Sequence, residues 1–367
     1  MPSRLAIFCP SFDNGGVERM LVNLANGLAR TGVQVDFFVS SRERPYLGTL
    51  ADGTRLFVLG SRRAANVLPR MCEYLEAEPP DALLSAKDEA DELAARLRRE
   101  TSAPTRFYIR AVVNVSQRMR WRAPWRRRGI RRRMRRIYRD VDGVIAVSRG
   151  VADDVAALAG VGAERIAVAP NPVVTDDLFE LARAPAEHPW LDEDHHPLLV
   201  GVGRLGRQKN FELLLRAFAR VHGSTPALLI ILGEGRQRER LERLARKLDI
   251  AERVSMSGFV ENPYPFLRRA DLFVSSSRWE GSPNALTEAL ALGTPVVSTD
   301  CPSGPREILD GGRYGRLVPL DDPRALARAI EDELREPHAP ALLEAAASRF
   351  TVAASVRAYR TAMGLQE

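Results

Sequence analysis

Short apolar runs of strand type alternate with segments of helical spacing along the whole chain, in two series. The first series has its apolar runs at residues 5–9, 33–39, 55–59, 82–85, 107–113, 143–147 and 166–169, and the second at 198–202, 227–232, 253–256, 272–275 and 295–298. Strands that alternate with helices form a parallel sheet with helices packed on its faces. The sequence therefore predicts an α/β protein with two Rossmann-like halves. Ligands of such halves bind where strand carboxyl ends and helix amino ends meet.

A polar, acidic stretch at residues 176–197 separates the two series. It contains three of the five histidines of the chain and ends in Asp192-Glu-Asp-His-His-Pro197. This composition favours a solvated hinge, and a metal site at the histidines is the alternative. The 367 residues suit two domains. We therefore expect an N-terminal domain at 1–175, a linker at 176–197 and a C-terminal domain at 198–349.

The composition indicates a globular protein in a reducing compartment. Apolar residues make up 45% and charged residues 28% of the chain, which argues against a disordered protein. No apolar run approaches the about 18–20 residues that cross a bilayer, and the first residues lack the pattern of a signal peptide. Cys9, Cys72 and Cys301 are too few and too scattered for a disulfide framework or a zinc knuckle. We therefore expect a cytoplasmic location.

Arginine is concentrated in one segment of the first half. The net charge is +7, and residues 106–139 contain 14 arginines and no acidic residue. Because like charges at this density repel one another, an anionic partner is expected. Nucleic acid, anionic lipid headgroups and a phosphorylated acceptor are the candidates. A helix that merely exposes its arginines to solvent is the alternative.

The same segment has the features of a membrane-surface helix. Tryptophans interleave with the arginines, and Ile130, Met134 and Ile137 fall on one helical face. An Arg-rich amphipathic helix flanked by tryptophan is typical of peripheral membrane elements. The alternative is that this apolar face belongs to the core. The candidates for contact with an anionic membrane are Trp121, Trp125, Arg127 and Arg131.

The first candidate motif is a glycine pair, Gly15 and Gly16, between the first strand and the first helix. Paired glycines allow a ligand close to the backbone, and the following helix directs free N–H groups at an anion. The spacing is not GxGxxG, which disfavours a nicotinamide cofactor. A plain tight turn is the alternative.

The second candidate motif, Gly201-Val-Gly-Arg204-Leu-Gly-Arg-Gln-Lys209-Asn210, also joins a strand to a helix. Its glycines keep the turn open, and Arg204 and Lys209 bring two cations near a helix N-terminus. Arginine binds phosphate bidentately and lysine neutralises developing charge, so the pair suits a diphosphate leaving group. A surface turn with ordinary cations is the alternative.

The third candidate motif places two glutamates, Glu280 and Glu288, around a predicted helix start. We expect Pro283 in the first turn and Ser282 as the cap, with Glu280 in the loop and Glu288 farther along the helix. The amides between them form an anion site, which suits a nucleotide-sugar better than a glycosidase carboxylate pair. The candidate ligand-binding residues of this segment are Gly281, Ser282, Asn284, Ala285, Leu286 and Glu288.

These motifs, together with Gly293-Thr-Pro-Val-Val and Ser303-Gly-Pro-Arg-Glu307, resemble glycosyltransferase family 4. The resemblance is specific over about 198–319. In the first half it covers the element order, the glycine pair, Ala146-Val-Ser148 and Pro170-Asn-Pro172. It implies the GT-B fold, retention of configuration and transfer without a metal or other cofactor. It also implies an acceptor-binding N-terminal domain, a nucleotide-sugar-binding C-terminal domain and a last helix, about 350–367, that returns to the N-terminal domain.

The resemblance also implies roles for individual residues. Arg204 and Lys209 would bind the donor diphosphate, Glu280 the donor sugar and Glu288 the ribose. The backbone from Gly258 to Val260 would hold the base.

The chain departs from the family pattern in its first half. Many relatives carry a histidine after the strand that corresponds to 107–113, whereas no histidine occurs here before His188. Arg110 and Asn114 are the polar residues at that place, and we take them as candidates for acceptor contact. A retaining transfer needs no enzyme nucleophile if the leaving diphosphate takes the acceptor proton.

Asp140-Val-Asp142 has the spelling of a metal-binding DxD motif. It precedes a strand and therefore lies at the edge of the sheet opposite the expected ligand site. We expect a structural role for both aspartates and no bound metal.

The predicted function is a retaining, metal-independent glycosyltransferase. It would use a nucleoside-diphosphate sugar, with a UDP-sugar favoured and a GDP-sugar possible, and a lipid-linked, lipopolysaccharide or polysaccharide acceptor. It would work as a peripheral protein at the cytoplasmic face of the inner membrane. One alternative is a glycosyltransferase with a soluble small-molecule acceptor, and others are a phosphorylase or an inactive homologue. A nucleic-acid-binding protein is the remaining class, although no nucleic-acid-reading module is recognisable.

Overall fold

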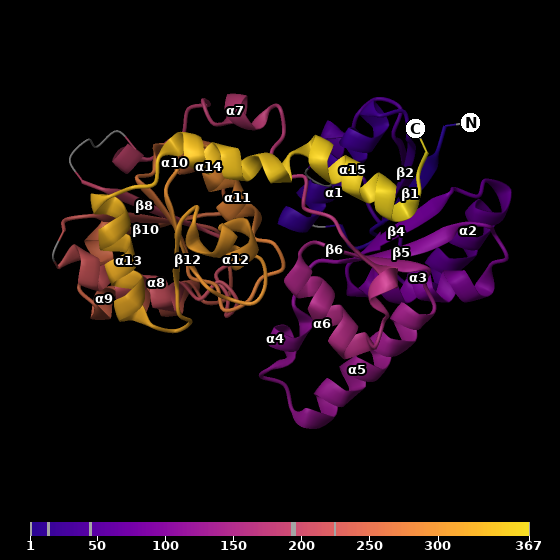
Figure 1. Cartoon of the computed structure of the whole chain (residues 1–367), viewed down its shortest axis with the longest axis horizontal. Helices are drawn as coiled ribbons and strands as arrows, with labels where there is room; N and C mark the ends of the chain where they lie inside the picture. Colours follow the sequence, from indigo (N-terminus) through magenta and orange to yellow (C-terminus); the bar gives the residue numbers. More distant parts are fainter. Residues whose placement is uncertain (1, 13–14, 44–45, 192–195, 224, 367) are drawn as a thin grey trace. The chain divides into compact units, whose positions relative to one another are not determined.

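The computed structural model describes residues 2–12, 15–43, 46–191, 196–223 and 225–366. The chain divides into two compact units (Figure 1). Unit 1 comprises Met1–Val173 and Phe350–Glu367, and unit 2 comprises Val174–Arg349. Each unit contains one parallel sheet, which confirms the predicted α/β class.

The sheet of unit 1 has seven strands in the order β3-β2-β1-β4-β5-β6-β7. The strands are β1 (Arg4–Phe8), β2 (Gln34–Val39), β3 (Arg55–Val58), β4 (Ala82–Ala86), β5 (Arg106–Ala111), β6 (Gly143–Ala146) and β7 (Ile166–Val168). Successive connections run in one direction from β1 and in the other from β4. The carboxyl ends of β1 and β4 therefore form the switch point where α/β sheets bind ligands.

Helices cover both faces of this sheet. They are α1 (Gly16–Arg30), α2 (Ala64–Ala77), α3 (Asp88–Glu100), α4 (Val115–Met119), α5 (Pro124–Arg139), α6 (Arg149–Ala159) and α15 (Val352–Met363), with 3₁₀ turns η1 (Leu47–Thr49) and η2 (Ala163–Arg165). Along β1, Phe8 packs into one apolar cluster and Ile7 into the other, because alternate strand residues face opposite sides. The C-terminal helix α15 packs beside α1 (Figure 1), and its residue Val356 lies in the same cluster as Ile7.

The sheet of unit 2 has six strands in the order β10-β9-β8-β11-β12-β13. The strands are β8 (Leu198–Val202), β9 (Leu228–Leu232), β10 (Val254–Gly258), β11 (Leu272–Ser275), β12 (Val296–Thr299) and β13 (Arg316–Val318). Its switch point lies between β8 and β11. The inner strands are buried as parallel strands with two covered faces are, and all five residues of β9 are buried.

Unit 2 has eight helices in its described part. They are α7 (Leu178–Leu181), α8 (Phe211–His222), α9 (Arg238–Lys247), α10 (Tyr264–Arg269), α11 (Asn284–Ala291), α12 (Pro305–Ile308), α13 (Pro323–Arg335) and α14 (Pro340–Ala347), with 3₁₀ turns η3 (Pro189–Leu191), η4 (Ala251–Arg253) and η5 (Asp310–Gly312). A further 3₁₀ turn, η6 (Ser348–Phe350), lies at the boundary of the units. None of the helices in the described chain combines the length and apolar character needed to cross a bilayer.

The stretch expected as a linker packs on unit 2 over most of its described length. Leu178 is fully buried, and Nδ2 of Asn262 donates a hydrogen bond to the carbonyl of Leu181 at 2.8 Å. Nε2 of His188 lies 2.9 Å from Oγ of Ser255. A few apolar and ring contacts therefore hold this polar stretch in place. Residues 192–195 of the predicted hinge, which include His195 of its three histidines, lie outside the described residues.

The apolar face of α5 differs from the expectation of a membrane-facing stripe. Met134 and Ile137 are buried in the core of unit 1, and Ile130 packs against the same cluster. The alternative stated above, that this face belongs to the core, is the correct one. What α5 presents to solvent is its arginines and the exposed side chains of Trp121 and Trp125 around its start, 55% and 70% accessible.

Candidate functional site

The best-defined polar site lies at the switch point of unit 2, where the loops after β8 and β11 meet. Three hydrogen bonds join the two loops. Oγ of Ser276 donates to the carbonyl of Lys209 at 2.8 Å, and the amide of Arg278 donates to the carbonyl of Gln208 at 2.8 Å. Nε2 of Gln208 donates to the carbonyl of Trp279 at 3.0 Å. The second and third candidate motifs, which lie far apart in the sequence, are therefore bonded to each other at the switch point.

Lys209 and Glu280 form an ion pair at the centre of these loops. The Nζ atom of Lys209 lies 2.7 Å from Oε1 of Glu280, and the carboxylate is 8% exposed. Glu280 accepts two further hydrogen bonds, from Oγ of Ser277 at 2.6 Å and from Nε2 of Gln208 at 3.3 Å. The carboxylate is thus fixed by three donors, and the ammonium group, 22% exposed, is held at the surface of the loops.

Two glycines make room for this arrangement. A Cβ atom at Gly203, whose φ is +150°, would lie 2.6 Å from Cε of Lys209. A Cβ atom at Gly233 would lie 2.1 Å from the carbonyl oxygen of Gly203. Side chains at these positions would collide with the lysine stem or with backbone. Gly203 of the second motif is therefore explained by the path of Lys209, and Gly233 by its close approach to the backbone of Gly203.

A third loop, after β12, completes the site. The amide of Glu280 donates to the carbonyl of Pro302 at 2.9 Å, and the amide of Ser303 donates back to the carbonyl of Glu280 at 3.3 Å. The neighbouring thiol of Cys301 is 3% exposed, and burial raises its pKa. Raised pKa values disfavour the thiolate, so Cys301 is not a nucleophile here.

The helix α11 presents its N-terminus next to Glu280. Its N-cap is Pro283 and no side chain caps it, so the expected capping by Ser282 is wrong, and Pro283 precedes the first turn. Gly281, Ser282, Asn284, Ala285 and Leu286 line this start of the helix. By helix geometry the first amides point along the axis toward the loop. Glu288 lies one turn farther, is 1% exposed and is therefore fixed by packing.

Arg204 and the loop after β10 flank the same glycines. Arg204 is exposed and makes no ion pair with any carboxylate in the described chain. Gly258 has a φ of +83°, and its carbonyl accepts a hydrogen bond from the amide of Gly233 at 2.6 Å. Val260 is half-buried, while Phe259 between them is 54% exposed. The predicted residues from the three segments are thus collected around one switch point.

The switch point of unit 1 has its own buried charges. Gly15 is the N-cap of α1 and Gly16 its first residue. Glu18, two residues on, pairs with Lys87, which follows β4 and has a φ of +81°. The Nζ atom of Lys87 also donates to the carbonyl of Ser11 at 2.5 Å. The glycine pair therefore adjoins an ion pair that joins the loops after β1 and β4. Asn14 lies outside the described residues.

Arg110 and Asn114 lie in packed positions. Arg110 is 2% exposed, and its guanidinium donates to the hydroxyl of Tyr359 and to Oδ1 of Asn171, both at 2.7 Å. Asn114 is 7% exposed, and its Oδ1 accepts from the amide of Gln117 at 3.0 Å as the cap of α4. Both side chains are thus engaged in hydrogen bonds within unit 1.

The membrane candidates lie around the start of α5. The guanidinium of Arg126 stacks over the ring of Trp125, and that of Arg120 over the ring of Trp121. Nε of Arg127 donates to the carbonyl of Arg122 at 2.9 Å, which fixes the turn before the helix. Arg131 is exposed.

The DxD aspartates are engaged within unit 1. Oδ2 of Asp142 accepts from the amide of Phe107 at 2.7 Å and extends the pairing of β5 with β6. Asp140 pairs with Arg99 at 2.5 Å. Within the residues described, no three His, Cys, Asp or Glu side chains gather as metal ligands do.

Sequence reasoning missed several residues that hold the site. Ser277 and Gln208 fix Glu280, and Lys87 pairs with Glu18. The serine run that follows β11 and the scarcity of lysine were the available signals, since only three lysines occur in the chain. Both signals lie at strand carboxyl ends, where ligand sites form.

The comparisons with known proteins agree with this geometry. Residues 14–177 match Glycosyltransferase Family 4, and residues 196–336 match Glycosyl transferases group 1. Lipopolysaccharide core biosynthesis glycosyltransferase LpsE of Rhizobium meliloti is 29% identical over 87% of this chain and 85% of that protein.

Two further similarities are informative. The N-acetylgalactosamine-N,N'-diacetylbacillosaminyl-diphospho-undecaprenol 4-alpha-N-acetylgalactosaminyltransferase of Campylobacter jejuni is 30% identical over 54% of this chain, and this match spans only 53% of that enzyme. Anabaena Alr3699/HepE, solved with UDP and glucose, superposes with a TM-score of 0.78 over 99% of both chains at 17% identity. This likeness shows the fold, which is that of solved GT-B glycosyltransferases.

Proposed function

The chain belongs to glycosyltransferase family 4 and has the GT-B fold, and on this premise we propose that it transfers a sugar from a nucleoside-diphosphate sugar with retention of configuration. The observation that carries the proposal is the arrangement at the switch point of unit 2. There, the Lys209–Glu280 pair, the exposed Arg204 and the start of α11 adjoin one another. Cations and helix amides together bind a diphosphate.

Each residue has a chemical role in this proposal. Arg204 and Lys209 bind the diphosphate and stabilise its charge as the bond from the anomeric carbon to the leaving oxygen breaks. Glu280 binds sugar hydroxyls and holds Lys209 in place, and Glu288 binds the ribose. The acceptor oxygen attacks the same face, and its proton passes to the leaving diphosphate. Because the protein supplies the cations, transfer proceeds without a metal.

A UDP-sugar is the favoured donor, which the structure of HepE with UDP and glucose supports. A lipid-linked, lipopolysaccharide or polysaccharide acceptor is supported by the names of two relatives, the lipopolysaccharide core glycosyltransferase LpsE and the diphospho-undecaprenol glycosyltransferase of Campylobacter jejuni. We place the reaction at the cytoplasmic face of the membrane. The exposed Trp121 and Trp125, each stacked with an arginine, support peripheral membrane attachment by unit 1. In this proposal unit 1 binds the acceptor and unit 2 binds the donor.

A thermal-shift panel with UDP, GDP, ADP and CMP tests the donor site. A nucleotide at about 100 times its Kd stabilises the protein by about 2.7 kcal/mol. We expect UDP to give the largest shift. Arg204→Ala should reduce it, while Arg220→Ala, an exposed arginine in the last turn of α8, should not. The absence of a shift with all four nucleotides would contradict the proposal. Turnover that is lost with EDTA would contradict metal independence.

A further inference from the structure

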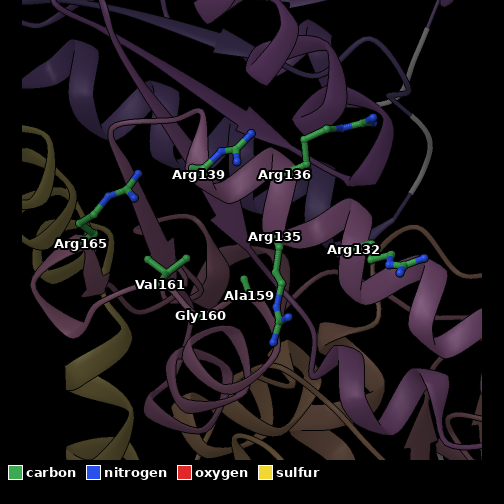
Figure 2. Close-up of a pocket in the computed structure, with 8 residues that line it drawn as sticks. All are labelled: Arg132, Arg135, Arg136, Arg139, Ala159, Gly160, Val161 and Arg165. Carbon is green, nitrogen blue, oxygen red and sulfur yellow. The ribbon is translucent and has the colours of Figure 1, made fainter.

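A second cluster of positive charge lies at the amino ends of β6 and β7 in the sheet of unit 1. Five arginines line one hollow of about 370 Å³, together with Ala159, Gly160 and Val161, which form an uncharged wall (Figure 2). The arginines are Arg132, Arg135, Arg136 and Arg139 of α5 and Arg165 of η2. In Figure 2, Arg135, Arg139 and Arg165 are drawn nearest to Ala159 and Val161, and the side chains of Arg132 and Arg136 point away from these two residues.

The topology separates this hollow from the substrate edge. It lies where α5 ends before β6 and where η2 ends before β7, which are the amino ends of those strands. Substrates of α/β sheets bind at the carboxyl ends. The hollow is therefore independent of the proposed donor and acceptor sites.

Structural roles account for only part of the charge. Arg136 pairs with Glu92 at 3.1 Å and Arg139 with Asp140 at 3.5 Å, and both stand in the last turn of α5, where cations are favourable. Arg132 and Arg135 stand earlier and pair with no carboxylate in the described chain. Like charges spaced three and four residues apart destabilise a helix. A bound anion would offset the repulsion between Arg132 and Arg135 on this face of α5.

Backbone carbonyls fix the orientation of Arg165 at the hollow. Its Nη2 donates to the carbonyl of Tyr138 at 3.1 Å and to the carbonyl of Val141, and it has no carboxylate partner within the described residues. Together, Arg132, Arg135 and Arg165 leave three positive charges uncompensated around one hollow. A terminal diphosphate group, whose last ionisation has a pKa of about 6, carries about two to three negative charges at pH 7.

We propose that this hollow is a binding site for a diphosphate group, held by Arg132, Arg135 and Arg165. Guanidinium groups match phosphate oxygens bidentately, which favours phosphate over a carboxylate ligand of equal charge. The diphosphate belongs either to a soluble molecule or to a lipid headgroup, and both sources share this chemistry. The site would hold this group at the amino ends of β6 and β7.

Calorimetric titration of the full chain with inorganic pyrophosphate tests the proposal. The donor site of unit 2 also binds pyrophosphate, so the titrations use Lys209→Ala as the background. We expect Arg132→Ala/Arg135→Ala to weaken the remaining binding by about a hundredfold, at about tenfold per 1.4 kcal/mol of lost interaction. The matched control Arg122→Ala/Arg128→Ala removes two exposed arginines of the same basic segment outside the hollow and should leave binding unchanged. Arg132→Lys/Arg135→Lys should recover only part of the affinity, because lysine keeps the charge and loses the bidentate geometry.

A second arm distinguishes the sources. Phosphatidylcholine vesicles that carry a polyprenyl diphosphate are compared with vesicles that carry the monophosphate. A lipid source predicts that the protein prefers the diphosphate vesicles and binds free pyrophosphate only weakly. It also predicts that Arg132→Ala/Arg135→Ala abolishes the preference for the diphosphate vesicles. Equal loss in the two double alanine variants would overturn the proposal, as would unchanged pyrophosphate binding in Arg132→Ala/Arg135→Ala. Tighter binding of single-stranded RNA than of pyrophosphate at this site would also overturn it, in favour of nucleic acid.

Discussion

The ammonium group of Lys209 lies 2.7 Å from Oε1 of Glu280, although the two residues come from loops that follow different strands. The pair forms because β8 and β11 are neighbours at the switch point of their sheet. Each side chain therefore partly neutralises the charge of the other and holds it in position. A change at one residue alters the position of the other.

Lys209→Met should lower kcat/KM by about 10²–10³-fold, the usual loss when one electrostatic contact to a leaving group is removed. The fold should persist because Ser277 and Gln208 still donate to Glu280. Steady-state kinetics with the preferred nucleotide-sugar measure the effect. Lys247→Met, at the exposed C-terminus of α9, is the control. Turnover of Lys209→Met equal to that of the control would remove Lys209 from the mechanism.

Gly203→Ala should reduce turnover by about tenfold or more, because the new Cβ would lie 2.6 Å from Cε of Lys209 and displace it. Gly206→Ala, in the same loop, meets nothing closer than 3.9 Å and should behave as wild type. Kinetics of the two variants, with circular dichroism to verify folding, make the comparison. Equal activities would mean that the lysine position is not constrained by this glycine.

The sequence predicted the strands well where apolar runs are long. All seven strands of unit 1 and five of the six in unit 2 occur close to their expected places. The missed strand, β13, has three residues, Arg316-Leu-Val318, and lies at a sheet edge. The equally short edge strand β7 was predicted because Ile166-Ala-Val168 is wholly apolar, whereas β13 begins with an arginine and gives a weaker apolar signal.

The candidate site was predictable in part because its motifs are local. Glycine, lysine and glutamate at strand ends indicate a phosphate site without knowledge of the fold. The partners of Arg110 could not be predicted. Tyr359 and Asn171 are 249 and 61 residues away in the chain. Polarity at a strand end made Arg110 a functional candidate, and only the packing of α15 reveals its hydrogen bond to Tyr359.

Tyr359→Phe should lower the free energy of unfolding by about 1–3 kcal/mol, because Nε of the buried Arg110 loses its 2.7 Å acceptor. The Nη1 atom of Arg110 already lacks a partner in the described chain, so the remaining bonds cannot easily compensate. Urea denaturation measures the change, and Tyr314→Phe in unit 2 is the control. Donor affinity should not change in either variant, since unit 2 is a compact unit with an apolar core of its own.

Asp91 should make stability depend on pH. It is buried and bonded to Oγ of Ser85 at 2.7 Å, and burial raises its pKa to about 8. The hydrogen bond from Ser85 and the charges of Arg133 and Arg118 oppose this rise in pKa, and the charge of Asp88 contributes to it. Because the pKa of Asp91 is higher in the folded protein than in the unfolded chain, the protonated carboxyl favours folding. Its contribution to the free energy of unfolding is complete below about pH 4 and is lost as the pH rises toward 8.

Asp91→Asn should remove this component of the pH dependence, because the amide stays neutral. Urea denaturation between pH 5 and about pH 8 compares the two proteins at each pH. We expect the variant to gain stability relative to wild type as the pH rises. Parallel curves for the two proteins would show that Asp91 does not titrate in this range.

Trp121→Ser/Trp125→Ser should weaken binding to anionic vesicles by about tenfold or more, because exposed indole rings anchor proteins at the lipid interface. Flotation with phosphatidylcholine vesicles, with and without phosphatidylglycerol, measures the bound fraction. Each arginine near an anionic surface adds about 1 kcal/mol, so wild type should prefer the anionic vesicles. Phe179→Ser, which removes a 43% exposed ring from unit 2, is the matched control. Equal recovery of wild type with both vesicle types would sink the membrane proposal and leave the arginines of α5 to soluble anions.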